Sequence, residues 1–189
     1  MSIYFISDLH LGHKNCLSFD NRPFKDIEEM DNKLIENWNN QVRSHNDYVY
    51  ILGDISWYNA EKTAKIVSQL NGHKVLITGN HDKDLIKKPI IKDLFQEITN
   101  YQEIKYQDTP LVLSHYPIPC FNQHYYGAYH LYGHVHNSFE WNMMERVKYE
   151  MEYLYDKPCN MYNVGCMLPY MNYTPQTLNE IIKKGDFCD

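Results

Sequence analysis

The sequence predicts an α/β fold in a single domain that spans residues 1–189. Three observations support this prediction. The chain has the length of one domain, and its 43% hydrophobic residues are enough to build a core. Short apolar runs alternate with segments of helical periodicity, as in folds that pack helices against a sheet. No repeat, low-complexity tract or linker rich in Pro, Gly and Ser divides the chain.

The N-terminal half alternates predicted strands with predicted helices. Strands are expected at residues 3–6, 48–52 and 75–78, and helices at residues 26–44, 60–70 and 84–95. The first helix has apolar residues at every third or fourth position: Ile27, Met30, Leu34, Trp38 and Val42. Gly72 is expected near the C-terminal cap of the second helix, and Pro89 is expected to break the third.

The C-terminal half contains four further predicted strands. Residues 103–106 and 111–114 are expected to pair, because Asp108-Thr109-Pro110 forms a turn between them. Residues 130–132 and 161–164 supply the other two strands, and residues 140–155 between them are expected to be helical. A last helix is expected to begin at Thr174, as its cap, with Pro175 in the first turn, and to end at Gly185.

Charge, cysteines and hydropathy limit the environment of the protein. The net charge of −6 argues against binding to extended nucleic acid, but bound cations would reverse the local sign and admit a small phosphorylated substrate. No stretch of the sequence predicts a signal peptide or membrane contact. The five cysteines include no C-x-x-C pair, which favours a reducing, cytoplasmic location. They are Cys16, Cys120, Cys159, Cys166 and Cys188.

Polar side chains follow five of the predicted strands. The motifs are Asp8-Leu9-His10, Gly53-Asp54, Gly79-Asn80-His81-Asp82, Ser114-His115 and Gly133-His134-Val135-His136. Each motif on its own also fits a turn or a hydrogen-bonded structural residue. Together they place five of the ten histidines, three aspartates and an asparagine at strand ends, where ligands gather in open α/β sheets. Their conjunction predicts one shared site.

This ordered set resembles the calcineurin-like metallophosphoesterase superfamily, whose motifs are D-x-H, G-D, G-N-H-[DE], H and G-H-x-H. Asn163-Val164-Gly165 resembles a further C-terminal stretch of many members. The run from Asp8 to Asn15, followed by Asn21-Arg22-Pro23-Phe24, resembles a small bacterial and phage-type branch of predicted phosphoesterases. The resemblance implies a four-layer α/β/β/α sandwich with two mixed β-sheets and a metal site at their edge.

The resemblance also implies a role for each motif residue. Asp8, His10 and His136 would hold one metal ion, and Asn80, His115 and His134 would hold a second. Asp54 would bridge the two ions and take part in catalysis, and His81 would remain unligated and face the leaving group. Arg22 and His13 are weaker candidates for substrate contact. Cys166 replaces the acidic residue that often follows Asn-Val-Gly in relatives, which argues against a substrate contact from that loop.

The chemistry of these residues supports the implied roles. Carboxylate and amide oxygens with imidazole nitrogens, and no thiolate, suit Mn²⁺, with Fe²⁺, Zn²⁺ or Ni²⁺ as alternatives, better than Ca²⁺. Two such cations, roughly 3.5–4 Å apart, would activate a hydroxide for attack on phosphorus. His81 would then supply a proton to the departing oxygen. Asp82 would either orient His81 or cap the next helix.

The sequence therefore predicts a dinuclear metal-dependent hydrolase of a phosphomonoester or phosphodiester. A nuclease or cyclic-nucleotide phosphodiesterase is the alternative within this class. A non-catalytic metal-binding interaction scaffold is the alternative outside it, and the presence of His81 argues against it. Purely structural metals are disfavoured, because structural sites are usually single and rich in cysteine. The oligomeric state is open, and residues 138–160 are expected either to wall the pocket or to form an interface.

Overall fold

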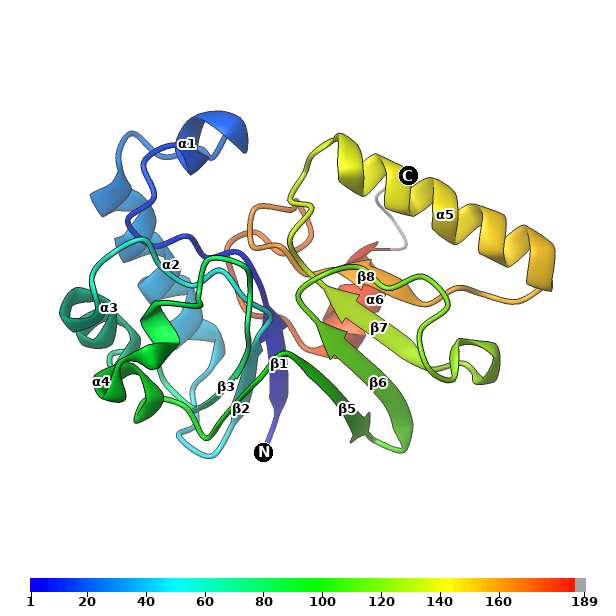
Figure 1. The fold of residues 1–189 in the computed structure, drawn as a ribbon, viewed down its shortest axis with the longest axis horizontal. Helices are drawn as coiled ribbons and strands as arrows, with labels where there is room; N and C mark the ends of the chain where they lie inside the picture. Colours follow the sequence, from blue (N-terminus) through cyan, green and yellow to red (C-terminus); the bar gives the residue numbers. More distant parts are fainter. Residues whose placement is uncertain (186–189) are drawn as a thin grey trace.

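The computed structural model describes residues 1–185 and contains two four-stranded β-sheets (Figure 1). The first sheet has the order β1 (Ile3–Ile6), β2 (Tyr48–Ile51), β3 (His73–Ile77) and β4 (Glu97–Thr99), with all strands parallel. The second has the order β5 (Tyr101–Tyr106), β6 (Thr109–Ser114), β7 (Tyr129–Tyr132) and β8 (Met161–Asn163). There β5 pairs antiparallel with β6, and the other pairs are parallel.

Helices lie on the outer sides of the two sheets, which completes the four layers (Figure 1). The first sheet is accompanied by α2 (Ile27–Gln41), α3 (Ala60–Val67) and α4 (Pro89–Lys92), and the second by α5 (Phe139–Tyr155). The last helix, α6 (Leu178–Gly185), contacts β1 of the first sheet and β8 of the second. Shorter elements are α1 (Cys16–Phe19) and the 3₁₀ turns η1 (Leu85–Lys87) and η2 (His124–Tyr126). The predicted α/β fold is confirmed, with the difference that only the second sheet is mixed. Each connection within the first sheet passes through helical turns, as parallel neighbours require.

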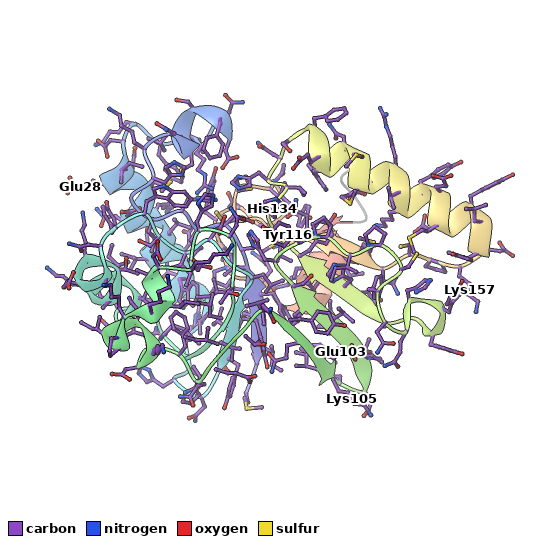
Figure 2. All side chains as sticks on the ribbon, viewed as in Figure 1. Glu28, Glu103, Lys105, Tyr116, His134 and Lys157 are labelled. Atoms are coloured by element: carbon purple, nitrogen blue, oxygen red, sulfur yellow. The ribbon has the colours of Figure 1, made fainter. Side chains whose placement is uncertain are left out.

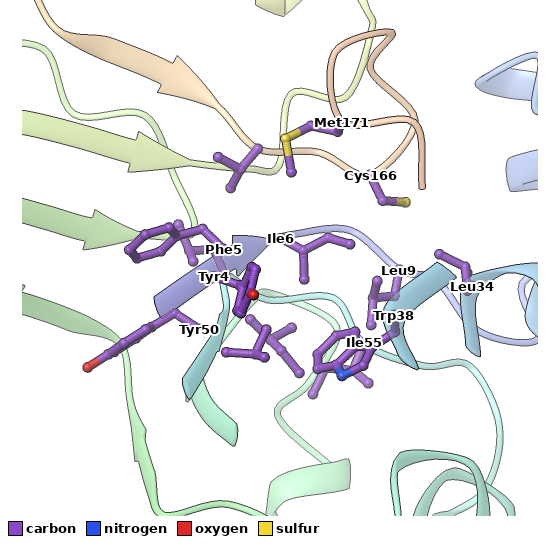
Figure 3. Packing of buried hydrophobic residues seen from close by; sticks show 14 of the residues in the cluster. Tyr4, Phe5, Ile6, Leu9, Leu34, Trp38, Tyr50, Ile55, Cys166 and Met171 are labelled. Atoms are coloured by element: carbon purple, nitrogen blue, oxygen red, sulfur yellow. The ribbon is translucent and has the colours of Figure 1, made fainter. Parts of the chain in front are cut away.

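The two sheets share one hydrophobic core around β1. Phe5 and Ile6 of β1 are fully buried. The Phe5 ring stacks on Tyr50 of β2 at 5.7 Å and meets Tyr106 of β5 at 6.5 Å between centroids. Figure 3 shows this packing, with Met171 of the C-terminal segment above β1. A second cluster lies beneath α5 and includes Val112, Tyr132, Met144, Met151 and Met161. Through β1, this core therefore holds the first sheet against the second.

The predicted start of the last helix is wrong. Thr174 does not cap α6, because the neighbouring Gln176 is still bonded to β1: the backbone amides of Phe5 and Gln176 each donate to the other's carbonyl, at 2.8 and 3.1 Å. The helix begins only after this pairing ends. Thr177 is its cap, since the Thr177 amide donates to Oε2 of Glu180 (2.8 Å) and the Glu180 amide donates to Oγ1 of Thr177 (3.4 Å).

The break predicted at Pro89 is confirmed, because η1 ends before it and α4 begins at it. No helix among residues 1–185 is long and apolar enough to cross a membrane. Cys16, Cys159 and Cys166 are buried free thiols, and Cys120 is an exposed one. Cys188 lies outside the described residues.

His130 is expected to make stability depend on pH. It is fully buried, its Nδ1–H donates to the Val112 carbonyl (3.0 Å), and its Nε2 accepts from the Ile118 amide (3.0 Å). Burial lowers its pKa from 6.5 to about 4, although hydrogen bonding to the backbone of Val112 and Tyr116 opposes the shift. The histidine of the unfolded chain has the higher pKa, so it binds its proton first as pH falls. The free energy of unfolding therefore decreases between pH 6.5 and about pH 4, by about 3 kcal/mol at most.

Urea unfolding of metal-free protein at pH 7.5 and pH 4 measures this effect. His130→Asn is expected to be less stable than the parent at pH 7.5, because the Ile118 amide loses its acceptor. The difference between the two proteins should shrink as pH falls. A difference that stays constant with pH would show that His130 does not titrate in this way.

Candidate metal centre

The carboxyl ends of both sheets meet at one edge of the molecule, because β1 and β8 join there. Beyond β1, the Ser7 amide donates to the Val164 carbonyl and the Cys166 amide donates to the Ser7 carbonyl, both at 2.9 Å. The five predicted motifs follow β1, β2, β3, β6 and β7, so this junction brings them together. Figure 2 shows His134 and Tyr116 between the two halves of the molecule.

Five of the predicted ligands have backbones in the left-handed region, with φ between 49° and 70°. Non-glycine residues are uncommon there, although Asp and His tolerate it better than most. Strained backbone of this kind clusters at functional sites, where the surrounding structure maintains it. The five residues are Asp8, His10, Asp54, His134 and His136.

Two motif glycines allow the backbone to approach the buried carboxylates. A Cβ atom on Gly133 would overlap the Ser7 hydroxyl and the Asp8 carboxylate. A Cβ atom on Gly79 would overlap the Asp54 carboxylate and lie 2.6 Å from the Asp54 amide nitrogen. Only glycine lacks this atom. The glycines of G-H-x-H and G-N-H are therefore required by the packing of the acids beside them.

The structure brings together the three residues predicted to hold the first metal. Nε2 of His10 lies 3.1 Å from Nε2 of His136 and 3.8 Å from Oδ1 of Asp8. Nε2 of His136 lies 3.5 Å from the same oxygen of Asp8. Two imidazole nitrogens and a carboxylate oxygen thus surround one point, and they form a group that could hold a metal ion.

A second group, next to the first, contains Asp8, Asp54 and His115. Oδ2 of Asp54 lies 3.6 Å from Nε2 of His115 and 4.0 Å from Nε2 of His10, so this oxygen is close to an imidazole of each group. The amide oxygen of Asn80 lies 3.0 Å from Nε2 of His115. Asp8 belongs to both groups. Asp8 and Asp54 are therefore the two carboxylates that both ligand groups could share.

His134 lies beside the second group and not within it. Its ring centroid is 5.0 Å from that of His115 and 4.3 Å from that of Tyr116. Its backbone amide donates to Oδ2 of Asp8 at 3.1 Å. Among residues 1–185, neither ligand group includes a nitrogen of His134. Its role as a ligand stays a prediction.

The charge balance at this edge fits bound divalent cations. Asp8 and Asp54 are 0% and 2% exposed, and within residues 1–185 their carboxylates form ion contacts with histidines and with no Lys or Arg. Buried carboxylates are costly without compensating positive charge. Burial accordingly raises the pKa of Asp54, although His115 opposes the shift. The oxygen and imidazole donors form a mixed set that suits Mn²⁺, Fe²⁺ or Zn²⁺.

Asp20, which the sequence analysis missed, orients one of the predicted ligands. Nδ1 of His136 donates to Oδ1 of Asp20 at 2.8 Å, a contact that fixes the ring with Nε2 toward the first group. Burial lowers the pKa of His136, but the hydrogen bond to Asp20 and the charges of Asp8 and Asp20 outweigh it, so the pKa is raised. No spacing rule links Asp20 to His136, because the contact is purely tertiary.

The structure gives Arg22 a role inside the protein, and its contact with substrate stays a prediction. Its side chain is fully buried, and its guanidinium is used inside the protein. Nε and Nη2 donate to Oδ2 of Asp20 (2.9 and 2.8 Å), Nη1 donates to the Leu9 carbonyl (3.0 Å) and Nη2 donates to the Asp8 carbonyl (2.9 Å). Arg22 therefore holds the backbone that carries Asp8 and His10.

Arg22→Met is expected to lower the free energy of unfolding by about 3–5 kcal/mol, because it leaves the Asp20 carboxylate buried without its partner. Urea unfolding of the metal-free protein measures the loss. Arg43→Met, at an exposed arginine, is the matched control and should change stability by less than about 0.5 kcal/mol. Unchanged stability together with weaker inhibition by inorganic phosphate would favour Arg22 as a substrate contact.

Asp82 fixes the loop that carries Asp54. It is fully buried; its Oδ2 accepts the amides of Asp54 (2.9 Å) and Gly79 (2.8 Å), and its Oδ1 accepts the amide of Ile55 (3.0 Å). The sequence offered two roles for this carboxylate, orienting His81 or capping a helix. The structure shows a third, since Asp82 ties the loop after β2 to the loop after β3.

His81 lies at the edge of the ligand groups, beside Trp57. Its ring centroid is 4.3 Å from that of Trp57 and 6.4 Å from that of His10, and its amide donates to Oδ1 of Asp54 at 3.0 Å. Trp57 also stacks on His13, with centroids 3.9 Å apart. Nδ1 of His13 lies 3.4 Å from Nδ1 of His10. His13 thus borders a predicted ligand, and its contact with substrate stays a prediction.

A pocket of about 500 Å³ opens beside His81. Trp57 and Leu85 form part of its wall, and its lining includes the charged side chains of Glu61, Asp84 and Lys88. A larger hollow of about 680 Å³ lies along α2 and contains none of the predicted site residues. Because His81 lines it, the pocket is placed to receive part of a molecule bound at the ligand groups.

Comparisons with known proteins show the family of this chain. The family model described as calcineurin-like phosphoesterase matches residues 1–153. An uncharacterized protein of Methanocaldococcus jannaschii is 34% identical over 183 residues, covering 96% of this chain and 89% of that protein. The gene 66 protein of Mycobacterium phage L5 is 33% identical over 134 residues, covering 60% of this chain and 62% of the phage protein. The crystal structure of a protein of unknown function from Aquifex aeolicus has a TM-score of 0.69 at 26% identity, covering 96% and 97%.

Proposed function

Because the chain belongs to the calcineurin-like phosphoesterase family, we propose that it hydrolyses a small phosphomonoester or phosphodiester with the help of two divalent metal ions. The observation that carries this proposal is the meeting of two ligand groups at one buried edge. Two adjacent groups with carboxylates between them support a pair of ions more than a single ion. Mn²⁺ is the proposed ion, with Fe²⁺, Zn²⁺ and Ni²⁺ as alternatives.

Each residue near the site has a proposed task. Bound divalent cations would lower the pKa of water and offset the charge of a phosphoryl group. Asp8, His10 and His136 would hold one ion, and Asn80, His115 and His134 the other, with Asp54 between them. His81 is exposed and outside both ligand groups, so it is available to donate a proton to the departing oxygen.

The pocket beside His81 supports a small substrate. Its volume of about 500 Å³ is in the range of sites for small molecules. Two of its three charged lining residues, Glu61 and Asp84, are acidic, which favours a leaving alcohol without a second phosphate. The net charge of −6 disfavours extended nucleic acid and therefore the nuclease alternative. The free cysteines support a cytoplasmic location, which we include in the proposal.

With Mn²⁺, the purified protein is expected to hydrolyse p-nitrophenyl phosphate or bis(p-nitrophenyl) phosphate. EDTA should abolish turnover and added Mn²⁺ should restore it, because the buried aspartates and histidines then regain their ions. Release of p-nitrophenol measures the rate, and metal content is measured on the same sample. Protein that binds metal but hydrolyses neither ester with any of the four ions would favour the scaffold alternative.

A further inference from the structure

The outer face of α5 is an exposed apolar surface. The helix lies along the outside of the molecule (Figure 1), and only Met144 and Met151 on its inner side are buried. Monomeric proteins rarely expose a contiguous apolar patch beyond about 300–600 Å². The exposed fractions on this helix are 72% for Phe139, 45% for Met143, 71% for Tyr149, 78% for Tyr153 and 65% for Leu154.

Part of this face has the spacing of a helix-packing seam. Phe139, Met143, Arg146, Glu150 and Tyr153 follow one another at intervals of four and three residues, which places them on one stripe. The stripe is apolar toward both ends and carries one positive and one negative charge at its centre. Within the described part of the chain, neither Arg146 nor Glu150 forms an ion pair.

We propose that α5 packs antiparallel against α5 of a second copy of this chain, across a two-fold axis level with position 148. In this register Arg146 lies opposite Glu150 of the partner subunit, and the symmetry repeats the pair. Met143 lies opposite Tyr153 of the partner subunit, a favourable sulfur–aromatic contact. The same axis therefore pairs the two charged positions of the stripe and two of its three apolar positions, Met143 and Tyr153.

The charges favour a second copy over a lipid surface. The helix contains Arg146 and Lys148 against four glutamates, and the whole chain carries −6, so an anionic bilayer would repel it. The five exposed apolar side chains offer roughly 500 Å² per subunit, and two copies together reach the roughly 1,000 Å² that a biological interface needs. A stripe whose two charges are complementary under a two-fold axis needs no other partner.

Light scattering on the full chain during gel filtration tests the proposal. The parent is expected to have twice the 22.6 kDa mass of one chain. Arg146→Glu and Glu150→Arg should each weaken the dimer at least about tenfold, because each places like charges opposite one another twice. An equimolar mixture of the two variants should form a heterodimer, because each then supplies the charge that the other lacks. The double variant R146E/E150R should also dimerise.

Glu28→Arg is the matched control, because Glu28 is exposed on α2 at the opposite end of the molecule (Figure 2). It changes the charge equally and should leave the dimer intact. A monomeric parent, a Glu150→Arg variant that dimerises as tightly as the parent, or a mixture that stays monomeric would each overturn the proposal. A monomeric parent that adsorbs to lipid vesicles would assign the face to a membrane instead. None of these measurements depends on phosphoesterase activity.

Discussion

Asp54→Asn is expected to weaken the binding of both metal ions together. Oδ2 of Asp54 lies within 4.0 Å of imidazole nitrogens from both ligand groups, so the amide nitrogen or neutral oxygen of Asn would replace a charge that both ions need. Removing only a supporting contact costs metal sites about 10–100-fold in affinity or activity, and loss of a bridging ligand should exceed that. Calorimetric titration with Mn²⁺ and measurement of bound metal give the number of ions per chain.

The free energy of unfolding of metal-free Asp54→Asn should not decrease, although its metal binding weakens. Burial raises the pKa of Asp54, so the folded protein is penalised at neutral pH, where the carboxylate must ionise. Asn carries no charge and relieves this penalty, so metal-free Asp54→Asn should be at least as stable as the parent. Asp93→Asn, at an exposed aspartate, should change neither property. Loss of only one ion in Asp54→Asn would contradict the bridging role.

Much of the fold could be predicted because it depends on local patterns. The apolar stripe of residues 26–44 becomes α2, with Asp26 as its cap accepting from the Glu29 amide at 2.9 Å. The motif residues were found because each directly follows an apolar strand. Their meeting point also follows from topology, since parallel strands end at the same edge of a sheet.

The features that sequence could not predict depend on contacts between distant segments. Thr174 and Pro175 look like a helix start, but the pairing of Gln176 with Phe5 delays the helix. β4 has only three residues, none of them buried, so it leaves no apolar run in the sequence. Trp57 belongs to none of the motifs, and its neighbours His13 and His81 become close only in the fold.

Arg22 and Asp20 show that the site, too, depends on contacts that the sequence could not predict. The motif resemblance places Arg22 near the predicted metal ligands, and its guanidinium does bond to the Asp8 carbonyl. The direction of that guanidinium is set by Asp20 and by the carbonyls of Asp8 and Leu9. Asp20 joins this buried arginine to His136. The loop before α2 is therefore a support for the first ligand group. Its residues are expected to affect metal binding through the position of the ligands that they support.

His81→Ala is expected to retain both metal ions and to lose about 10²–10⁴-fold in rate toward esters with poor leaving groups. The side chain belongs to neither ligand group and lies at the mouth of the pocket beside Trp57, so its removal takes away a proton donor and leaves the aspartates and histidines in place. A departing alkoxide needs that proton. A departing p-nitrophenolate is stable without it, so its ester should lose much less.

The test is therefore the ratio of the hydrolysis rates for two esters in each protein. Rates for p-nitrophenyl phosphate and for an alkyl phosphate are compared in the parent, in His81→Ala and in His45→Ala, which removes an exposed histidine elsewhere. Metal content is measured for all three proteins, because an effect through the metals would lower both rates equally. A selective loss for the alkyl ester assigns the proton to His81. Equal rates for the parent and His81→Ala on both esters would remove His81 from the mechanism, and the exposed imidazole would then have to serve the binding of the substrate in the pocket beside Trp57.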